Sequence, residues 1–249
     1  MKSKELNTGM TNVTSFDKEK EKMQRQMFSS LSHDLKTPLA SMIGSLEIYE
    51  RMKDKLTLDK KELLIATALQ EAYRLDNFVT NILDMAKLES GMVKIRSESF
   101  DVGILLRDCL TNLDNRLRGS DVTIEPLSGD MKIKSDASLV CRALSLLIDN
   151  AVKYGGNPST IRITYGKDVS GKFQICVYDN GRGIAEANME NIFSKYTRFV
   201  KSDQQSAGTG LGLAICREIM RLLGGMATVT NDSNGGAKFT LLFPEQSYT

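Results

Sequence analysis

Residues 28–46 have the sequence FSSLSHDLKTPLASMIGSL, in which apolar side chains recur every three to four positions. This spacing is typical of an amphipathic helix, which we expect to run from about Phe16 to Met52. A second pattern of the same period predicts a helix from about Leu58 to Glu89, with Asp59 as its N-cap. The expected apolar stripes are Phe28, Leu31, Leu35, Leu39, Met42 and Leu46 on the first helix, and Ile65, Leu69, Ala72, Val79, Ile82 and Ala86 on the second.

The link between these helices is short, so they should pair as an antiparallel hairpin. One hairpin cannot bury both apolar stripes fully, but two copies of the chain can do so in a four-helix bundle. The alternative is that the hairpin packs on the C-terminal half of the same chain. We therefore expect a homodimer through residues 16–90, preceded by a linker or an appended tail over residues 1–15.

The chain changes character beyond Gly91, where short β-type runs alternate with helical patterns and most of the 19 glycines lie. This alternation predicts an α/β sandwich with a mixed sheet over residues 91–249, and with the hairpin it gives an α+β fold class. The expected strands are Val93–Arg96, Val122–Glu125, Met131–Lys134, Ile161–Tyr165, Phe173–Tyr178, Met226–Asn231 and Lys238–Phe243. The expected helices are Val102–Arg118, Ala137–Tyr154, Ala187–Ser194 and Leu211–Leu223.

The bulk composition excludes several classes of protein. Lys and Arg number 33 against 31 for Asp and Glu, so charge gives no argument for binding nucleic acid or an anionic membrane. The sequence contains no run of about 18 apolar residues, the length that a membrane span needs, and residues 1–12 lack a signal-peptide core. We therefore expect a cytoplasmic location. The four cysteines lie far apart without CxxC spacing, which together with a single histidine argues against a zinc site. They could form disulfides, but each lies inside an apolar run, which favours buried, reduced thiols. They are Cys109, Cys141, Cys176 and Cys216.

The only histidine of the chain is His33. At 100° per residue it lies roughly 150° from the centre of the apolar stripe, so it should face away from the core, with Thr37 on the same side. A neutral imidazole can attack a phosphoryl group if a carboxylate such as Asp34 holds the tautomer and accepts the proton. Pro38 should bend the helix and expose the preceding turn. An ordinary surface histidine would fit the same pattern.

Three glycine-bearing segments follow in the second half of the chain. Residues 149–155 (DNAVKYG) end an expected helix, residues 179–184 (DNGRGI) follow an expected strand, and residues 208–213 (GTGLGL) lead into a helix. Glycines before a helix let backbone N–H groups approach phosphates. Neither a GxxxxGK[ST] loop nor a dinucleotide-binding motif is present, so neither of those nucleotide folds is indicated.

Polar side chains in these segments suit a nucleotide. Asn150 can coordinate Mg²⁺ beside phosphate oxygens, and Lys153 adds a positive charge. Asp179, at a strand end, can accept a hydrogen bond from an exocyclic amine such as that of adenine. Tyr154 offers an aromatic wall. The combination of three segments in this order is what favours nucleotide binding, because each motif alone also fits a plain turn.

Together these residues resemble the sensor histidine kinases of two-component signalling. Five segments are similar to the boxes of that family and occur in its order: H-box 32–39, N-box 147–155, G1-box 179–184, F-box 192–199 and G2-box 208–215. The resemblance covers nearly the whole chain after residue 16. It implies a helical hairpin followed by the Bergerat-type ATP-binding sandwich shared with gyrase, Hsp90 and MutL. The sequence of residues 32–49 is similar to that of the potassium-responsive branch of these kinases. The resemblance also implies that the chain is cytoplasmic or is the cytosolic portion of a membrane-tethered sensor.

The resemblance implies ATP-dependent autophosphorylation of His33 and transfer to an aspartate of a response regulator receiver domain, with ATP and Mg²⁺ as cofactors. Asp34 would be the base, and Thr37 would position water when the regulator is dephosphorylated. Residues 197–207 would form a mobile lid. In the ATP site, Asn150 would bind Mg²⁺, Lys153 the phosphates, Asp179 the adenine, and Lys195 and Arg198 the γ-phosphate, with further contacts from Tyr154, Gly181, Gly183, Gly208, Thr209, Gly210, Leu211 and Gly212.

The chain departs from the family at Leu146, where a second Asn is frequent and gyrase-type ATPases place a Glu. A Mg²⁺ shell with fewer protein ligands and more water would accommodate the change. Leu146 cannot act as a base, which disfavours an ATPase-driven conformational switch of the gyrase or Hsp90 type. A nucleotide-binding scaffold without catalysis is the other alternative.

Overall fold

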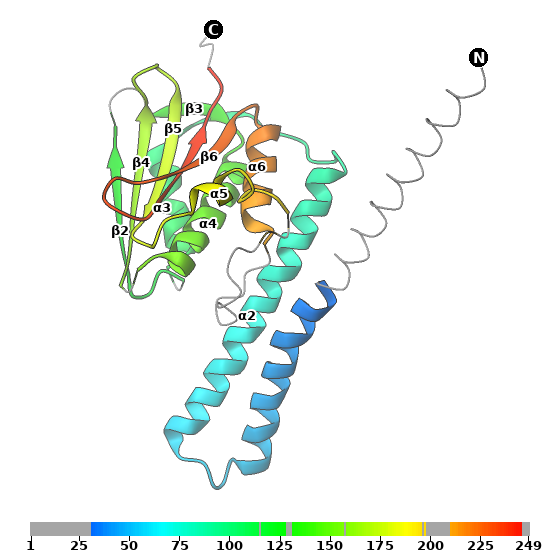
Figure 1. Ribbon diagram of the computed structural model, residues 1–249. Coiled ribbons are helices and arrows are strands. Elements are labelled where there is room, and N and C mark those ends of the chain that lie inside the picture. Colours follow the sequence, from blue (N-terminus) through cyan, green and yellow to red (C-terminus); the bar gives the residue numbers. More distant parts are fainter. Residues whose placement is uncertain are drawn as a thin grey trace, which may run out of the picture. The chain divides into compact units, whose positions relative to one another are not determined.

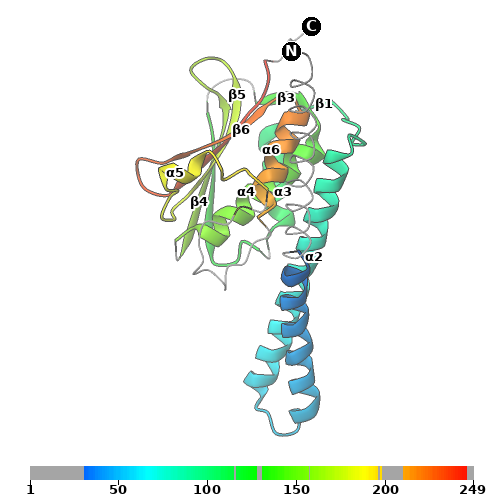
Figure 2. The same ribbon diagram turned by 45° about the vertical axis from the view of Figure 1, so that its right-hand side comes forward.

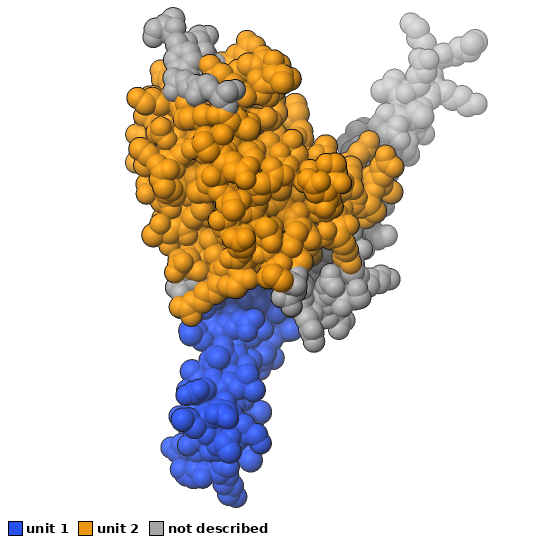
Figure 3. Space-filling model, turned by 90° about the vertical axis from the view of Figure 1, so that its left-hand side faces the viewer, with its two compact units in different colours: residues 1–80 blue, residues 81–249 orange. Residues whose placement is uncertain are grey.

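The computed structural model of the chain describes residues 31–114, 116–127, 131–156, 158–195, 197 and 210–245. They belong to two compact units, residues 1–80 and residues 81–249 (Figure 3). The helices are one over residues 31–52, α2 (Leu58–Glu89), α3 (Val102–Asn112), α4 (Ala137–Tyr154), α5 (Glu186–Met189) and α6 (Gly212–Leu222). The strands are β1 (Glu98–Asp101), β2 (Ser120–Pro126), β3 (Lys132–Ser135), β4 (Ser159–Lys167), β5 (Phe173–Asp179), β6 (Met226–Asn231) and β7 (Ala237–Leu242) (Figure 1).

The first unit is the predicted hairpin of two helices. Residues 16–30 of the expected first helix lie outside the described residues, and Asp59 lies in the first turn of α2 rather than at its N-cap. Ser45 of the first helix and Ala68 and Phe78 of α2 are buried within the chain. Much of the predicted stripes is exposed in the single chain, in line with the expectation that one hairpin cannot bury both stripes. The exposed stripe residues include Leu39, Leu46, Ile65, Leu69 and Val79.

The last turns of α2 belong to the second unit, although we predicted a division near residue 90. Met85 is buried in the core of that unit. Arg142 of α4 donates from Nε to Oδ2 of Asp84 at 2.7 Å and from Nη2 to Oδ1 of Asn81 at 2.7 Å. Charge-assisted hydrogen bonds of this length fix the end of α2 on α4. No helix within the described ranges is both long enough and apolar enough to cross a membrane.

Five strands form the main sheet of the second unit, in the order β2-β4-β5-β7-β6 (Figure 1). β2 runs parallel to β4, and the other neighbouring pairs are antiparallel. β1 and β3 pair antiparallel in a separate two-stranded sheet. The helical hairpin and the mixed sheet confirm the predicted α+β class.

One face of the main sheet is apolar because the side chains alternate along each strand. Ile161 and Ile163 of β4, Val177 of β5 and Leu241 of β7 are fully buried. The helices α3, α4 and α6 cover this face (Figure 2). Asp179 ends β5 opposite Ile161, so its carboxylate lies at the margin of the apolar layer.

The predicted strand at Val93–Arg96 is wrong. Residues 92–97 have no regular structure, and β1 begins at Glu98. The backbone N–H of Arg96 donates to Oδ2 of Asp136 at 2.8 Å instead of joining a strand ladder. Residues 93–96 therefore form a connection rather than a strand, because the Asp136 carboxylate accepts a backbone hydrogen bond that a neighbouring strand would otherwise accept.

Two helices end earlier than predicted. α3 ends at Asn112 rather than Arg118, and the chain then turns, with the N–H of Arg116 bonded to the carbonyl oxygen of Leu113 at 2.8 Å. Asn favours caps and turns over helix interiors, which accounts for the early end. α5 also ends well before the predicted Ser194. By contrast, α2, α4 and β6 have the predicted bounds.

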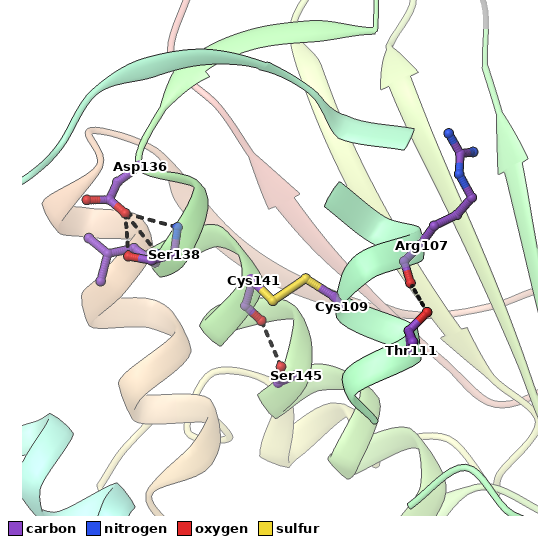
Figure 4. Close-up of a disulfide and its surroundings, with 8 residues drawn as sticks. Arg107, Cys109, Thr111, Asp136, Ser138, Cys141 and Ser145 are labelled. Carbon is purple, nitrogen blue, oxygen red and sulfur yellow. Dashed lines mark hydrogen bonds between the residues drawn. A yellow bond between two sulfur atoms is a disulfide. The ribbon is translucent and has the colours of Figure 1, made fainter. Parts of the chain in front are cut away.

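Cys109 and Cys141 form a disulfide that joins α3 to α4 (Figure 4). This corrects the prediction that all four thiols are reduced. The packing of the two helices brings the Cα atoms of these cysteines to 5.9 Å, which is within disulfide range. Cys176 and Cys216 are free and buried, as predicted, and burial raises the pKa of the Cys216 thiol to about 12.

Candidate functional site

His33 lies on the exposed side of the first helix. Its side chain is 81% exposed, whereas that of Asp34 is 17% exposed. Nδ1 of His33 and Oδ1 of Asp34 are 3.6 Å apart. The exposure agrees with the helical spacing, and the geometry makes Nδ1 the ring nitrogen nearest the carboxylate and leaves Nε2 for chemistry with a partner.

Thr37 follows His33 by one helical turn. Its Oγ1 donates a hydrogen bond to the backbone carbonyl oxygen of His33 at 3.1 Å, and its side chain is exposed. Pro38 is buried, and the helix continues through it to residue 52. His33 and Thr37 therefore present their side chains on the same stretch of regular helix.

α4 carries the first nucleotide segment in its last turns. The helix begins where the Asp136 carboxylate accepts the N–H of Ser138 at 3.0 Å, so its start is capped by a charged side chain. Asn150 is half-buried, and Lys153 and Tyr154 are exposed at the C-terminal end. α4 packs its apolar face on the sheet, and the polar side chains of its last turns remain accessible at its C-terminal end.

A cleft of about 350 Å³ lies between the end of α4 and the loop after β5. The loop approaches the helix so closely that a Cβ on Gly181 would lie 2.1 Å from the carbonyl oxygen of Tyr154, so only glycine fits there. The structure thereby joins two of the segments predicted to bind a nucleotide, although Asn150 and Lys195 are not among the described residues that line the cleft. The lining residues are Lys153, Tyr154, Gly155, Gly156, Asn180, Gly181 and Arg182.

Asp179 is buried beside this cleft at the end of β5. Its Oδ1 accepts the backbone N–H of Gly181 at 2.9 Å and that of Ala237 at 3.1 Å. Within the part of the chain that the structure describes, both hydrogen bonds end on Oδ1. Oδ2 of the same carboxylate can therefore accept a hydrogen bond from a ligand. Gly183, also predicted to bind the nucleotide, lies further along the same loop.

Sequence reasoning missed the role of Asn180. Its Oδ1 accepts the N–H groups of Gly156 and Thr160, both at 2.9 Å, and its Nδ2 donates to the carbonyl oxygen of Pro158 at 3.0 Å. One side chain thus holds the segment between α4 and β4. An Asn in a glycine turn signals local backbone bonding, but its partners lie 20 to 24 residues upstream, where no local rule would place them.

The third nucleotide segment is described from Gly210 onward, whereas Gly208 and Thr209 lie outside the described residues. Leu211 is fully buried immediately before α6, which anchors the start of that helix. A Cβ on Gly212 would lie 3.6 Å from Cδ2 of Leu146, which is itself buried. The position at which the resemblance would place a second Asn is therefore an apolar packing position beside the start of α6.

Lys195 does not line the cleft and instead forms an ion pair at the end of α2. Its ammonium pairs with the carboxylate of Glu89 at the end of α2, and both side chains are exposed. Phe193, from the same segment, is buried in the core and fixes the backbone nearby. Arg198 and residues 198–207 of the expected lid lie outside the described residues.

Two protein-family models match the chain in order. The His Kinase A (phospho-acceptor) domain matches residues 23–91, and the Histidine kinase-, DNA gyrase B-, and HSP90-like ATPase matches residues 135–247. The sensor protein KdpD of Escherichia coli (strain K12) is 34% identical over 241 residues, covering 92% of this chain and 25% of that protein. The chain belongs to the histidine kinase family, and it spans about a quarter of the length of this relative.

Solved structures agree with this assignment. The catalytic domain of the histidine kinase ThkA is 29% identical with a TM-score of 0.51, covering 60% of this chain and 95% of that one. ThkA in complex with the response regulator protein TrrA gives a TM-score of 0.67 at 24% identity, covering 93% of this chain and 66% of that one. The second likeness extends the shared fold over both units.

Proposed function

We propose that the chain catalyses ATP-dependent autophosphorylation of His33 and then transfers the phosphoryl group to an aspartate of a response regulator receiver domain. The observation that carries this proposal is the cleft that joins Lys153, Tyr154 and the loop after Asp179, in a chain with one exposed histidine. The complex of the related ThkA with a response regulator supports the choice of partner.

The proposed chemical step joins the imidazole of His33 to the γ-phosphate of ATP. Nε2 attacks the γ-phosphorus, and the N–P bond forms as the bond from phosphorus to the β–γ bridging oxygen breaks, so that ADP leaves. The imidazole acquires positive charge and must lose the proton on Nδ1. The Asp34 carboxylate, 3.6 Å from Nδ1, is the base that accepts it.

In the ATP site, Oδ2 of Asp179 would accept a hydrogen bond from the adenine amine, and Lys153 would contact the phosphates. Lys195 and Arg198 would contact the γ-phosphate, and the glycines at the start of α6 would offer backbone N–H groups. Asn150 supplies one amide oxygen, which suits Mg²⁺ because that ion takes its remaining ligands from phosphates and water. Among the described residues no cluster of three or more His, Cys, Asp or Glu side chains forms a separate metal site.

Incubation with γ-labelled ATP and Mg²⁺ tests the proposal. Wild-type protein should acquire an acid-labile, base-stable label, and His33→Ala should reduce it to background. Ser41→Ala is the matched control, because Ser41 is an exposed residue of the same helix, and it should keep the label. A label retained in His33→Ala would overturn the proposal. Steady ATP hydrolysis without any phosphoprotein would favour the ATPase alternative.

We also propose that the chain dephosphorylates its response regulator, with Thr37 positioning the attacking water. The exposed Thr37 hydroxyl, one turn from His33, supports this role. Thr37→Ala should slow regulator dephosphorylation at least tenfold and leave autophosphorylation within twofold of wild type. Equal loss of both activities would show that Thr37 is needed for the structure of the helix and does not position the attacking water.

The proposed active form is a homodimer through residues 16–90, with residues 91–249 as the catalytic part. Leu39, Leu46, Ile65 and Leu69 support it, because these residues of the predicted stripes are exposed in the single chain. A second hairpin would cover them in a four-helix bundle. The assignment to the potassium-responsive branch stays a prediction.

A further inference from the structure

Asn231, at the end of β6, makes a paired contact with the loop that follows Asp179. Its Oδ1 accepts the backbone N–H of Ile184 at 2.8 Å, and its Nδ2 donates to the carbonyl oxygen of the same residue at 2.9 Å. The side chain thus satisfies both polar backbone groups of one residue 47 positions away in sequence. A two-point bond of this kind restrains both the position and the rotation of the peptide.

The partner of Asn231 across the β6–β7 ladder fixes the other end of the same loop. Asn231 pairs in register with Ala237, whose N–H donates to Oδ1 of Asp179 at 3.1 Å. Gly236 packs so tightly there that a Cβ would lie 1.8 Å from the carbonyl oxygen of Asp179. The end of the hairpin therefore bonds the loop at its first residue, Asp179, and at its last, Ile184.

The hairpin end is itself restrained. The N–H of Asp232 donates to the carbonyl oxygen of Gly236 at 3.0 Å, and the N–H of Gly235 donates to that of Asp232 at 3.1 Å. The Asp232 carboxylate also lies 3.5 Å from Nη2 of Arg162 on β4. Asn231 therefore connects the loop to a turn that is tied to the sheet.

We propose that Asn231 is a positioning residue for adenine recognition: by holding Ile184 it fixes the loop whose Gly181 N–H orients the Asp179 carboxylate. The inference rests on the proposed role of Asp179 toward the exocyclic amine of adenine. Loss of Asn231 should weaken the recognition of that amine in particular. The contacts to the phosphates and ribose do not depend on this end of the loop, so their contribution to the affinity should change little.

The test compares the affinities of the purified chain for ADP and for inosine diphosphate, whose base has a carbonyl group in place of the amine. Asn231→Ala should weaken ADP binding about five- to tenfold, the loss expected for one ordinary hydrogen bond to the adenine amine, and inosine diphosphate binding less than about twofold. Asn231→Asp keeps the acceptor and loses the donor, so it should give a smaller loss. Asn234→Ala, in the same turn, is the matched control and should bind both ligands as wild type does.

Asp179→Asn separates the inference from the function on which it rests. If this variant loses the preference for ADP and Asn231→Ala loses much of it, the inference is supported. Suppose instead that Asp179→Asn loses the preference for ADP while Asn231→Ala either keeps it or binds both nucleotides equally more weakly. The role of Asn231 is then overturned and the proposed ATP site stands. If Asp179→Asn keeps the preference, the adenine role of Asp179 fails and the inference fails with it.

Discussion

At the scale of single residues, Asp136 shows how one carboxylate can serve two segments. Its Oδ1 accepts the hydroxyl of Ser138 at 2.6 Å and caps α4, while its Oδ2 accepts the N–H of Arg96. Burial alone would raise the pKa of Asp136, but these hydrogen bonds outweigh it and hold the pKa below its ordinary value of 3.8. The carboxylate is therefore bound more tightly when it is ionised.

The sign of this pKa shift predicts a pH dependence. A lowered pKa in the folded chain gives stability that is complete above pH 5 and is lost as the pH falls through 3.8 toward the folded value. Asp136→Ala should lower the free energy of unfolding at pH 7 by about 1–2 kcal/mol, the usual loss for a helix cap. Urea titrations of both proteins from pH 7 to pH 3 should show this difference shrinking at acid pH. A difference that grows toward pH 3 would contradict the assignment.

At the scale of elements, α3 and α4 are joined covalently by Cys109 and Cys141. The two cysteines are 32 positions apart in sequence, so closing this loop removes considerable freedom from the unfolded chain. The oxidised protein should be more stable than the reduced one by about 2–4 kcal/mol. Chemical unfolding with and without dithiothreitol measures this difference.

Two variants make the disulfide prediction specific. The double variant Cys109→Ser, Cys141→Ser should unfold at the same denaturant concentration whether or not dithiothreitol is present. Cys176→Ala removes a free, buried cysteine and should keep the shift on reduction. A wild-type protein that mass spectrometry shows to be oxidised, yet that unfolds identically after reduction, would contradict the prediction.

The contact between the end of α2 and the segment after α5 predicts a change in nucleotide affinity. Glu89 pairs with the Lys195 ammonium that the proposed function assigns to the γ-phosphate. An exposed ion pair stabilises by about 0–1 kcal/mol, so Glu89→Gln should lower the apparent KM for ATP by up to about fivefold. Initial rates of autophosphorylation measure it, with Glu98→Gln, an exposed carboxylate of β1, as the control.

A double variant checks the route of that effect. If Glu89 acts through Lys195, Glu89→Gln should change nothing further in a Lys195→Ala background. An equal improvement in that background would show that the ion pair does not compete with the nucleotide.

Elements with strong local signals were predicted from the sequence, and elements that depend on distant partners were not. α4 has an Asp before it and a regular apolar face, and its predicted bounds are those of the structure. The strand predicted at Val93–Arg96 failed because Asp136, 40 residues later in sequence, binds Arg96. The Cys109–Cys141 disulfide and the Asn231 contact escaped prediction for the same reason, since the fold alone brings those residues together.

At the scale of the whole molecule, the exposed apolar stripe predicts the association state. Leu69 is 52% exposed on the predicted stripe, and Leu63 is 66% exposed about 120° away around α2. Leu69→Glu should convert a dimer to a monomer in light scattering after size exclusion, because the charge would be buried in the bundle. Leu63→Glu should remain a dimer. Identical behaviour of the two variants would contradict the bundle as the site of pairing.

The bond from Ala237 to Asp179 also has a consequence for synthesis of the chain. Its two ends are 58 residues apart, and the carboxylate is made first. At ordinary elongation rates that gap corresponds to roughly 3–12 s, during which a growing chain exposes the loop without its closing hairpin. The helices of the first unit are synthesised before Asp179 and can form ahead of this interval, whereas the base-recognising loop must wait for β7 to leave the ribosome. A nascent chain halted before Ala237 should therefore discriminate poorly between adenine and hypoxanthine nucleotides.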